Sequence, residues 1–202
     1  MNDTKEKILF AASKLFLKGG TSALSVRSIA REANVSTIGI YSYFQGKQGI
    51  LDALYIEGFE MVLAATQVPD GITDPKEGAM YAARGYINTA FEFQGHYRLI
   101  FGESDTGYQP SAEAKKAGEN AFLNIMKVVS HLLPINVSAS QQQEAAMQVW
   151  SLVHGYVCLK HHAIADVIDA SKWEGLILNA VSLHIDAMQN QYRSEGNSKT
   201  NG

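Results

Sequence analysis

The sequence has little of three features that would set its class. Only one of the 202 residues is a cysteine, Cys158, which excludes a disulfide framework and a zinc site built on several cysteines. The four prolines in the chain leave room for long helices, because proline interrupts a helix interior. The longest uncharged, apolar-rich stretch runs from Ala145 to Leu159 and is shorter than the roughly 18 residues of a membrane-spanning helix. The chain also begins without a basic-then-apolar leader. We therefore expect a cytoplasmic protein that does not enter a membrane.

The small net charge of −3 conceals an uneven distribution of charge. Residues 1–50 contain seven basic and three acidic side chains, whereas residues 51–202 contain ten basic and seventeen acidic ones. A basic N-terminal segment on an acidic remainder favours contact between that segment and a polyanion. Hydrophobic residues make up 46% of the chain, which is enough to build a sizeable core.

Apolar residues in the first fifty positions recur at helical spacing. The first apolar stripe consists of Ile8, Leu9, Ala12, Leu15 and Phe16. Gly19-Gly20 follows it and ends that helix. Ser25 is placed to cap a second helix and Ser36 a third helix that continues through Tyr43. A fourth helix begins at Lys47. Two short helices joined by a few residues form a helix-turn-helix, whose second helix can enter the major groove of DNA.

The outward residues of this segment suit contact with nucleic acid. Small or hydroxylated residues let a backbone approach base edges, tyrosine hydroxyls reach phosphates, and a basic residue at a helix start attracts a phosphate. We therefore predict these DNA-contacting residues: Arg27, Thr37, Ile38, Gly39, Tyr41, Ser42, Tyr43 and Lys47. Ser25 and Val26, at the start of the second helix, complete the predicted set, although Val26 also lies on the inward face of that helix. We expect the side chain of Tyr41 to take part both in phosphate contact and in core packing. The expected core of the segment is Ile29, Ala30, Ala33, Val35, Ile40 and Phe44.

The same residues resemble a known family. The stretch from Leu24 to Ser36, followed by Gly39-Ile40-Tyr41-Ser42-Tyr43-Phe44 and Lys47, resembles without a gap the DNA-binding head of the tetracycline-repressor (TetR) family. The resemblance covers about residues 5–55. Asn34 departs from it, since glycine is common there, and so does Gln48-Gly49, where an acidic and a small residue are usual. The resemblance implies a transcriptional regulator, most often a repressor, and not an enzyme.

From residue 51 onward the pattern predicts helices and no strands. Asp74-Pro75 starts one helix, Ser111 caps another, and two long apolar helices follow over about residues 140–168 and 172–192. Residues 193–202 are polar with two glycines and are predicted to be disordered. We thus predict an all-α protein of about nine helices. A helix-turn-helix DNA-binding domain would span residues 1–50, and a helical ligand-binding and dimerisation domain residues 51–192.

The helix over residues 140–168 is apolar around most of its girth, so it needs cover on more than one side. Together with the last helix and the same pair from a second chain, it would form a four-helix interface with twofold symmetry. The resemblance to the TetR family implies the same mode of dimerisation. A twofold homodimer predicts a palindromic double-stranded operator.

Two further stretches resemble the WHG subtype of TetR C-terminal domains, which is named for Trp150, His154 and Gly155. They run from Phe91 to Gly102 and from Val149 to Gly155. The resemblance implies a small, largely apolar ligand, with the candidate pocket residues Tyr81, Phe93, Tyr97, Phe101, Trp150 and His154. Trp150 and His154 lie four residues apart on one helical face. There they either line a pocket or belong to the core, with His154 hydrogen-bonded within its own domain.

Metal and catalytic sites are weakly supported. His154 and His161 share a face but lack a carboxylate at ligand spacing and the i, i+4 pairing of a helical zinc site. Cys158 lies one turn from His154, as in a nucleophile pair, but nothing nearby supplies an oxyanion hole. We expect no metal, no cofactor and no catalysis. Two alternatives stay open: a DNA-binding dimer without ligand control, and a helical small-molecule-binding protein or enzyme whose head only resembles a DNA reader.

Overall fold

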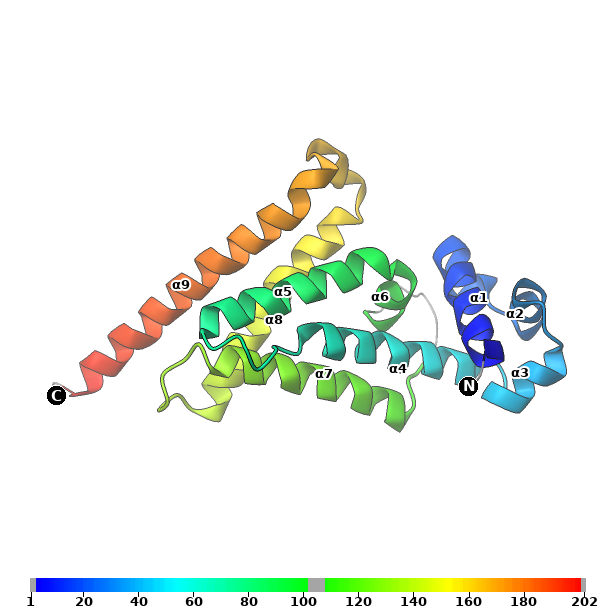
Figure 1. Ribbon diagram of the computed structural model, residues 1–202, viewed down its shortest axis with the longest axis horizontal. Coiled ribbons are helices and arrows are strands. Elements are labelled where there is room, and N and C mark those ends of the chain that lie inside the picture. The colour runs from blue at the N-terminus through cyan, green and yellow to red at the C-terminus, as the bar shows by residue number, and fades with distance from the viewer. Residues whose placement is uncertain (1–2, 102–107, 201–202) are drawn as a thin grey trace. The chain divides into compact units, whose positions relative to one another are not determined.

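The computed structural model describes residues 3–101 and 108–200. Within these ranges the chain forms nine α-helices, three short 3-10 helices and no strand (Figure 1). The α-helices are α1 (Asp3–Gly19), α2 (Val26–Ala33), α3 (Thr37–Phe44), α4 (Lys47–Thr66), α5 (Pro75–Glu92), α6 (Gln94–Ile100), α7 (Ala112–Ser130), α8 (Ala139–Lys160) and α9 (Trp173–Thr200). The 3-10 helices are η1 (Gly20–Ala23), η2 (Ala163–Val167) and η3 (Ala170–Lys172). The prediction of an all-α fold is confirmed.

Serine side chains begin the two short helices of the head, as their positions predict. Ser25 caps α2 in a reciprocal capping box, with its Oγ 3.0 Å from the backbone nitrogen of Ser28 and its own backbone nitrogen 2.9 Å from Ser28 Oγ. Ser36 Oγ accepts a hydrogen bond of 3.0 Å from the backbone N–H of Gly39 at the start of α3. Each bond satisfies a donor that the helix itself leaves without a partner.

The two C-terminal helices differ from the sequence-based expectation. α8 ends at Lys160, and the residues expected to continue it form η2 instead. The stretch from His161 to Lys172 contains no proline or glycine, so the sequence offers no local stop signal there. α9 continues to Thr200, past the predicted end near Tyr192. Arginine, glutamate and lysine in this extension favour a helix and no proline interrupts it, which outweighs the low propensity of Gly196 and Asn197. Residues 201 and 202 of the predicted disordered tail lie outside the described ranges.

The chain divides into two compact units, of which the first comprises the chain up to Met61 and Glu92–Ala121. Its core joins α1, α2, α3, α6 and the first part of α4, and includes the fully buried Ile8, Ile29, Ile40 and Ile50. His96 of α6 connects three of these helices. Its Nε2 lies 2.9 Å from Glu57 Oε2 of α4, and its Nδ1 lies 3.4 Å from Ser13 Oγ of α1. The domain boundary at residue 50 stays a prediction.

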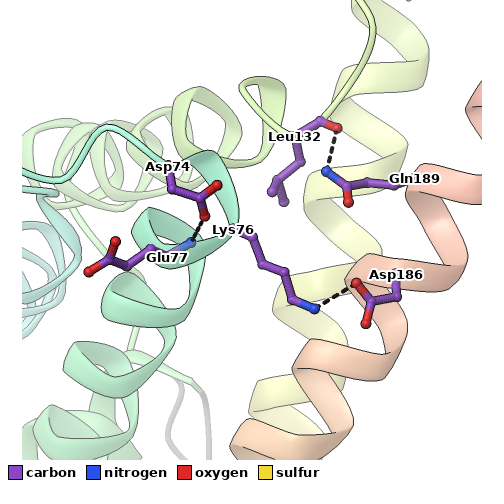
Figure 2. Close-up of polar contacts among 6 residues, drawn as sticks. All are labelled: Asp74, Lys76, Glu77, Leu132, Asp186 and Gln189. Carbon is purple, nitrogen blue, oxygen red and sulfur yellow. Dashed lines mark hydrogen bonds and ion pairs between the residues drawn. The ribbon is translucent and has the colours of Figure 1, made fainter.

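The second unit comprises Val62–Phe91 and the chain from Phe122 onward. α8 and α9 pack against each other in it and are connected through η2 and η3 (Figure 1). Figure 2 shows how α9 is attached: Asp186 pairs with Lys76 of α5 at 2.6 Å, and Gln189 donates to the carbonyl oxygen of Leu132 at 3.2 Å. Asp74 caps the nearby start of α5 by accepting from the backbone N–H of Glu77 at 2.7 Å. Of the helices in both described ranges, none has the length and apolar character needed to cross a membrane.

Candidate nucleic-acid interface

Two buried side chains fix the orientation of α3. Ile40 and Phe44 are 0% and 5% exposed, and they lie one helical turn apart, so a single stripe of α3 faces the core. The helix ends at Gln45 in the left-handed conformation, with φ of 58°. A Cβ on Gly49 in the first turn of α4 would lie 1.8 Å from the carbonyl oxygen of Phe44. Only glycine therefore allows α4 to begin this close to the end of α3.

The remaining residues of α3 face solvent. The side chains of Ile38, Tyr41 and Tyr43 are 78%, 57% and 41% exposed, Thr37 and Ser42 are also exposed, and Gly39 is half-buried. The structure thus collects six of the ten predicted DNA-contacting residues on this single helix. The exposed apolar side chains of Ile38, Tyr41 and Tyr43 have an unfavourable hydration free energy, which contact with a partner surface would reduce.

The three predicted contacts around the start of α2 differ in their environment. Ser25 is exposed, although its hydroxyl already serves the capping box. Arg27 is exposed in the first turn of α2, and its charge is available to a phosphate or a base. Val26 is half-buried and packs against the core of the first unit. Its side chain therefore contributes to packing, which leaves its backbone as the part that can approach DNA.

Lys47 has a structural contact that its position in the sequence does not reveal. Its Nζ donates a hydrogen bond of 2.8 Å to the carbonyl oxygen of Thr21 in η1. An ammonium group has three donors, so this bond leaves donors for a phosphate. The side chain is held in one place at the start of α4, which reduces the entropy lost when it contacts a phosphate.

The electrostatics of the head favour a polyanion. Between Lys7 and Leu51 the only carboxylate is Glu32, which pairs with Lys14 at 2.6 Å. The hydrogen bond from Lys14 and its positive charge lower the pKa of Glu32 below the ordinary value of a carboxyl group. The one acidic side chain within α2 and α3 is thereby matched by a lysine, while Arg27 and Arg31 of α2 leave an excess of positive charge in these two helices.

A small apolar cavity lies in the second unit. It has a volume of about 40 Å³ and is lined by uncharged residues of α4, α5, α7 and α8, including Trp150 and Tyr86. Trp150 Nε1 donates to Tyr86 Oη at 2.9 Å, and Thr66 Oγ1 donates to the carbonyl oxygen of Val62 at 2.8 Å and accepts from Asn124 at 3.0 Å. The polar groups of the wall are thus hydrogen-bonded to the protein, so the cavity presents a mainly hydrocarbon surface.

The predicted pocket residues are not brought together. Trp150 lines the cavity, whereas Tyr81 is 44% exposed on α5, and Phe93, Tyr97 and Phe101 belong to the first unit. His154 lies behind the wall, with Nδ1 at 3.4 Å from Tyr86 Oη and Nε2 at 3.4 Å from Cys158 Sγ. His154 is half-buried and hydrogen-bonded within its own unit, and its part in ligand binding stays a prediction. Tyr86 is a wall residue that the sequence interpretation missed. Its place one turn after Ala82 and Ala83 on the apolar stripe of α5 was the available signal.

These features are those of a helix-turn-helix DNA-binding protein, in which the helix-turn-helix segment is followed by a larger helical part. Comparison with known proteins identifies the family. A sequence model of "Bacterial regulatory proteins, tetR family" matches residues 8–54, and one of "Tetracyclin repressor-like, C-terminal domain" matches residues 80–169. The chain belongs to the tetR family of bacterial regulatory proteins.

The curated relatives match over the head. The probable HTH-type transcriptional regulator YttP of Bacillus subtilis is 44% identical over 57 residues, which is 28% of this chain and 28% of that protein. YvkB of the same organism, an uncharacterized HTH-type transcriptional regulator, is 43% identical over 54 residues, or 27% of this chain and 29% of that protein. The chain thus matches less than a third of the length of each relative.

Solved structures match over nearly the whole chain and show the fold. The TetR family regulator PfmR of Thermus thermophilus is similar with a TM-score of 0.67 and 17% identity, covering 89% of this chain and 97% of PfmR. The fatty acid degradation regulator FadR of Bacillus halodurans is similar with a TM-score of 0.73 and 14% identity, covering 92% of this chain and 95% of FadR.

Proposed function

We propose that the protein is a transcriptional repressor of the bacterial cytoplasm, which binds a palindromic operator as a homodimer. The observation that carries the proposal is α3, whose inward stripe is fixed by Ile40 and Phe44 while its remaining side chains are exposed, in a head whose first fifty residues carry a net positive charge. A helix of this kind fits the major groove, and the lysine and arginine side chains around it suit the phosphates on either side.

The exposed faces of α8 and α9 support the homodimer. On α8 the residues at every fourth position, Met147, Ser151, Gly155 and Leu159, are exposed and apolar or small. On α9 the side chains of Leu176 and Leu183 are 37% and 62% exposed. A second copy of the same pair would cover these apolar side chains, and small residues would allow its helices to approach closely.

The cavity beside Trp150 supports control by an uncharged, apolar ligand. Its wall contains no charged residue, so burial of an ionised ligand group would be uncompensated. At about 40 Å³ it is far smaller than the cavity of about 150 Å³ that holds benzene in an engineered core. A ligand of metabolite size therefore has to displace parts of the wall. Such displacement is a route by which binding favours one conformation over another, and a coupling of about 1–3 kcal/mol changes operator affinity roughly 5–150-fold.

The regulator is tested by selection of bound DNA from a random pool at about physiological salt, followed by titrations of the selected duplex over a series of salt concentrations. We expect an enriched palindrome and an affinity that falls steeply as salt is added, because neutralised phosphates release counterions. Absence of any salt-dependent DNA affinity would support the alternative of a helical small-molecule-binding protein or enzyme.

The dimer is tested by sedimentation of the Leu183→Glu variant beside a matched control, Leu123→Glu. Leu123 lies on α7 and is 57% exposed, close to the 62% of Leu183. We expect the first variant to dissociate and the second to stay dimeric, since only the first introduces charge into the α8 and α9 surface. If neither variant dissociates, the assignment of the α8 and α9 surface to the dimer interface is contradicted.

Ligand control is tested by thermal unfolding against a panel that pairs uncharged apolar compounds with their carboxylate counterparts. A bound ligand raises the melting temperature by mass action. We expect shifts only from the uncharged members, together with altered affinity for the selected DNA. If DNA binding is specific and no compound acts, a DNA-binding dimer without ligand control is the better description.

A further inference from the structure

The helix α3, which is proposed above to enter the major groove, lacks the side chains that usually read purines. None of the eight residues of α3 is charged, and none is asparagine or glutamine. In the major groove, guanine is most often recognised by a bidentate arginine or lysine, and adenine by a bidentate asparagine or glutamine. Base readout by α3 therefore depends on hydroxyl groups and on apolar contact.

Ile38 lies close to the centre of the outward face, one turn before Ser42. At 3.6 residues per turn, Ile38 and Ser42 lie nearly opposite the buried Ile40 and Phe44. The side chain of Ile38 is 78% exposed, which exceeds the 57% of Tyr41 and the 41% of Tyr43 on the same helix. Gly39 beside it carries no side chain, so this position adds no bulk between the α3 backbone and a surface that Ile38 contacts.

The major groove offers one apolar group for such a side chain. Among the four bases, only thymine presents a methyl group there, and apolar side chains contact it. The charge of the head fits DNA as the occupant, since residues 1–50 contain seven basic and three acidic side chains, and Glu32, the one carboxylate of α2 and α3, is paired with Lys14. An exposed isoleucine on a protein-binding surface would not require this excess of basic side chains.

We propose that Ile38 of each protomer contacts the 5-methyl group of a thymine in each operator half-site, which makes it a specificity-determining residue. This inference rests on the proposed function. It requires that both selected half-sites contain a thymine at the same distance from the operator centre.

Replacing one thymine at a time by deoxyuridine in the selected operator removes only the methyl group. Base pairing and the hydrogen-bonding pattern in the groove are unchanged. Burial of a single methyl group corresponds to about a fourfold change in affinity. We therefore expect one thymine position at which deoxyuridine weakens binding about fourfold per half-site, and roughly fifteenfold when both half-sites are changed.

The Ile38→Ala variant completes the test, because the contact exists only when both partners are present. The side chain is exposed, and alanine favours a helix, so the fold of the head is retained. We expect this variant to bind the thymine operator more weakly than the wild type and to lose the difference between thymine and deoxyuridine. Ile135→Ala is the matched control, since Ile135 is 104% exposed in the second unit, and it should keep the full difference.

The outcomes separate this inference from the proposed function. Failure to enrich any DNA would overturn both. Specific DNA binding in which no thymine position responds to deoxyuridine would overturn the role of Ile38 and leave the regulator intact. The same result follows if Ile38→Ala retains the deoxyuridine penalty, because another residue would then contact the methyl group.

Discussion

Replacing Lys47 by alanine should affect both the stability of the head and its affinity for DNA, and the structure separates the two effects. In the folded head, Nζ of Lys47 donates to the carbonyl oxygen of Thr21 at 2.8 Å, and the same oxygen accepts from the backbone N–H of Leu24 at 3.1 Å. The variant loses the charged donor but leaves the carbonyl oxygen with one partner. A hydrogen bond to a charged group contributes about 1.5–3 kcal/mol, and the remaining partner places the loss near the lower end.

A loss of about 1.5 kcal/mol corresponds to a fall in melting temperature of roughly 3–6 °C for a chain of this size. The second effect concerns phosphate contact. If each Lys47 of the dimer neutralises one phosphate, the slope of log affinity against log salt flattens by about 0.9 per half-site. The assay is fluorescence anisotropy with the selected operator over several salt concentrations, performed well below the melting temperature of the variant.

Two further variants complete the Lys47 experiment. Lys47→Arg keeps a positive charge at the start of α4 and should retain most of the salt slope. Lys127→Ala removes an exposed lysine of α7 in the second unit and controls for net charge. A lower melting temperature with an unchanged salt slope in Lys47→Ala would refute phosphate contact and leave Lys47 with its structural role alone.

Three other outcomes are expected. Gly49→Ala should lower the free energy of unfolding by about 2 kcal/mol or more in a denaturant titration, because the added Cβ would lie 1.8 Å from the Phe44 carbonyl oxygen. Gly39→Ala, whose Cβ would meet only Ser36 Oγ at 3.5 Å, should leave stability unchanged or raise it, and equal losses in both variants would refute the steric argument. Ala83→Val should fill the cavity beside Trp150, so that the melting temperature is kept or raised while ligand-induced shifts disappear; a marked fall would mean that the wall has no spare room. Lys14→Met should return the lowered pKa of Glu32 toward its ordinary value in an NMR titration. Because the pKa of Glu32 is lowered in the folded state, the pair of Lys14 and Glu32 stabilises the fold above the ordinary carboxyl pKa, and this stabilisation is lost as the pH falls through the folded pKa. A difference in stability between variant and wild type that persists at low pH would contradict this assignment.

The parts of the fold that were predictable from sequence are those with local signals. Ser25 and Ser36 lie three residues before the backbone donors that they accept from, Ser28 and Gly39, so a short stretch of sequence contains both partners. The stripe of Ile40 and Phe44 is likewise contained within one helix. Helix ends without such signals were misplaced, as the end of α8 at Lys160 illustrates.

The unpredicted parts depend on residues far apart in the chain. Lys47 and Thr21 are separated by 26 positions, and nothing near either residue indicates their contact. Gly49 lowers the helix propensity of α4 when considered alone, and its purpose emerges only from the carbonyl oxygen of Phe44 beside it. The position of Tyr81 likewise depends on how its helix packs. The sequence pattern left Tyr81 between pocket lining and core packing, but α5 turns Ala79, Ala82 and Ala83 inward, so Tyr81 is exposed.

The division of labour within α3 has an evolutionary consequence. Ile40 and Phe44 hold the helix in place, whereas Ile38 and Ser42 contribute nothing to the core. If α3 reads the operator as proposed, mutations at the latter two positions would alter which bases are preferred while leaving the stability of the head almost unchanged. A duplicated copy of this gene could acquire a new set of target promoters through one or two substitutions, without passing through an unfolded intermediate.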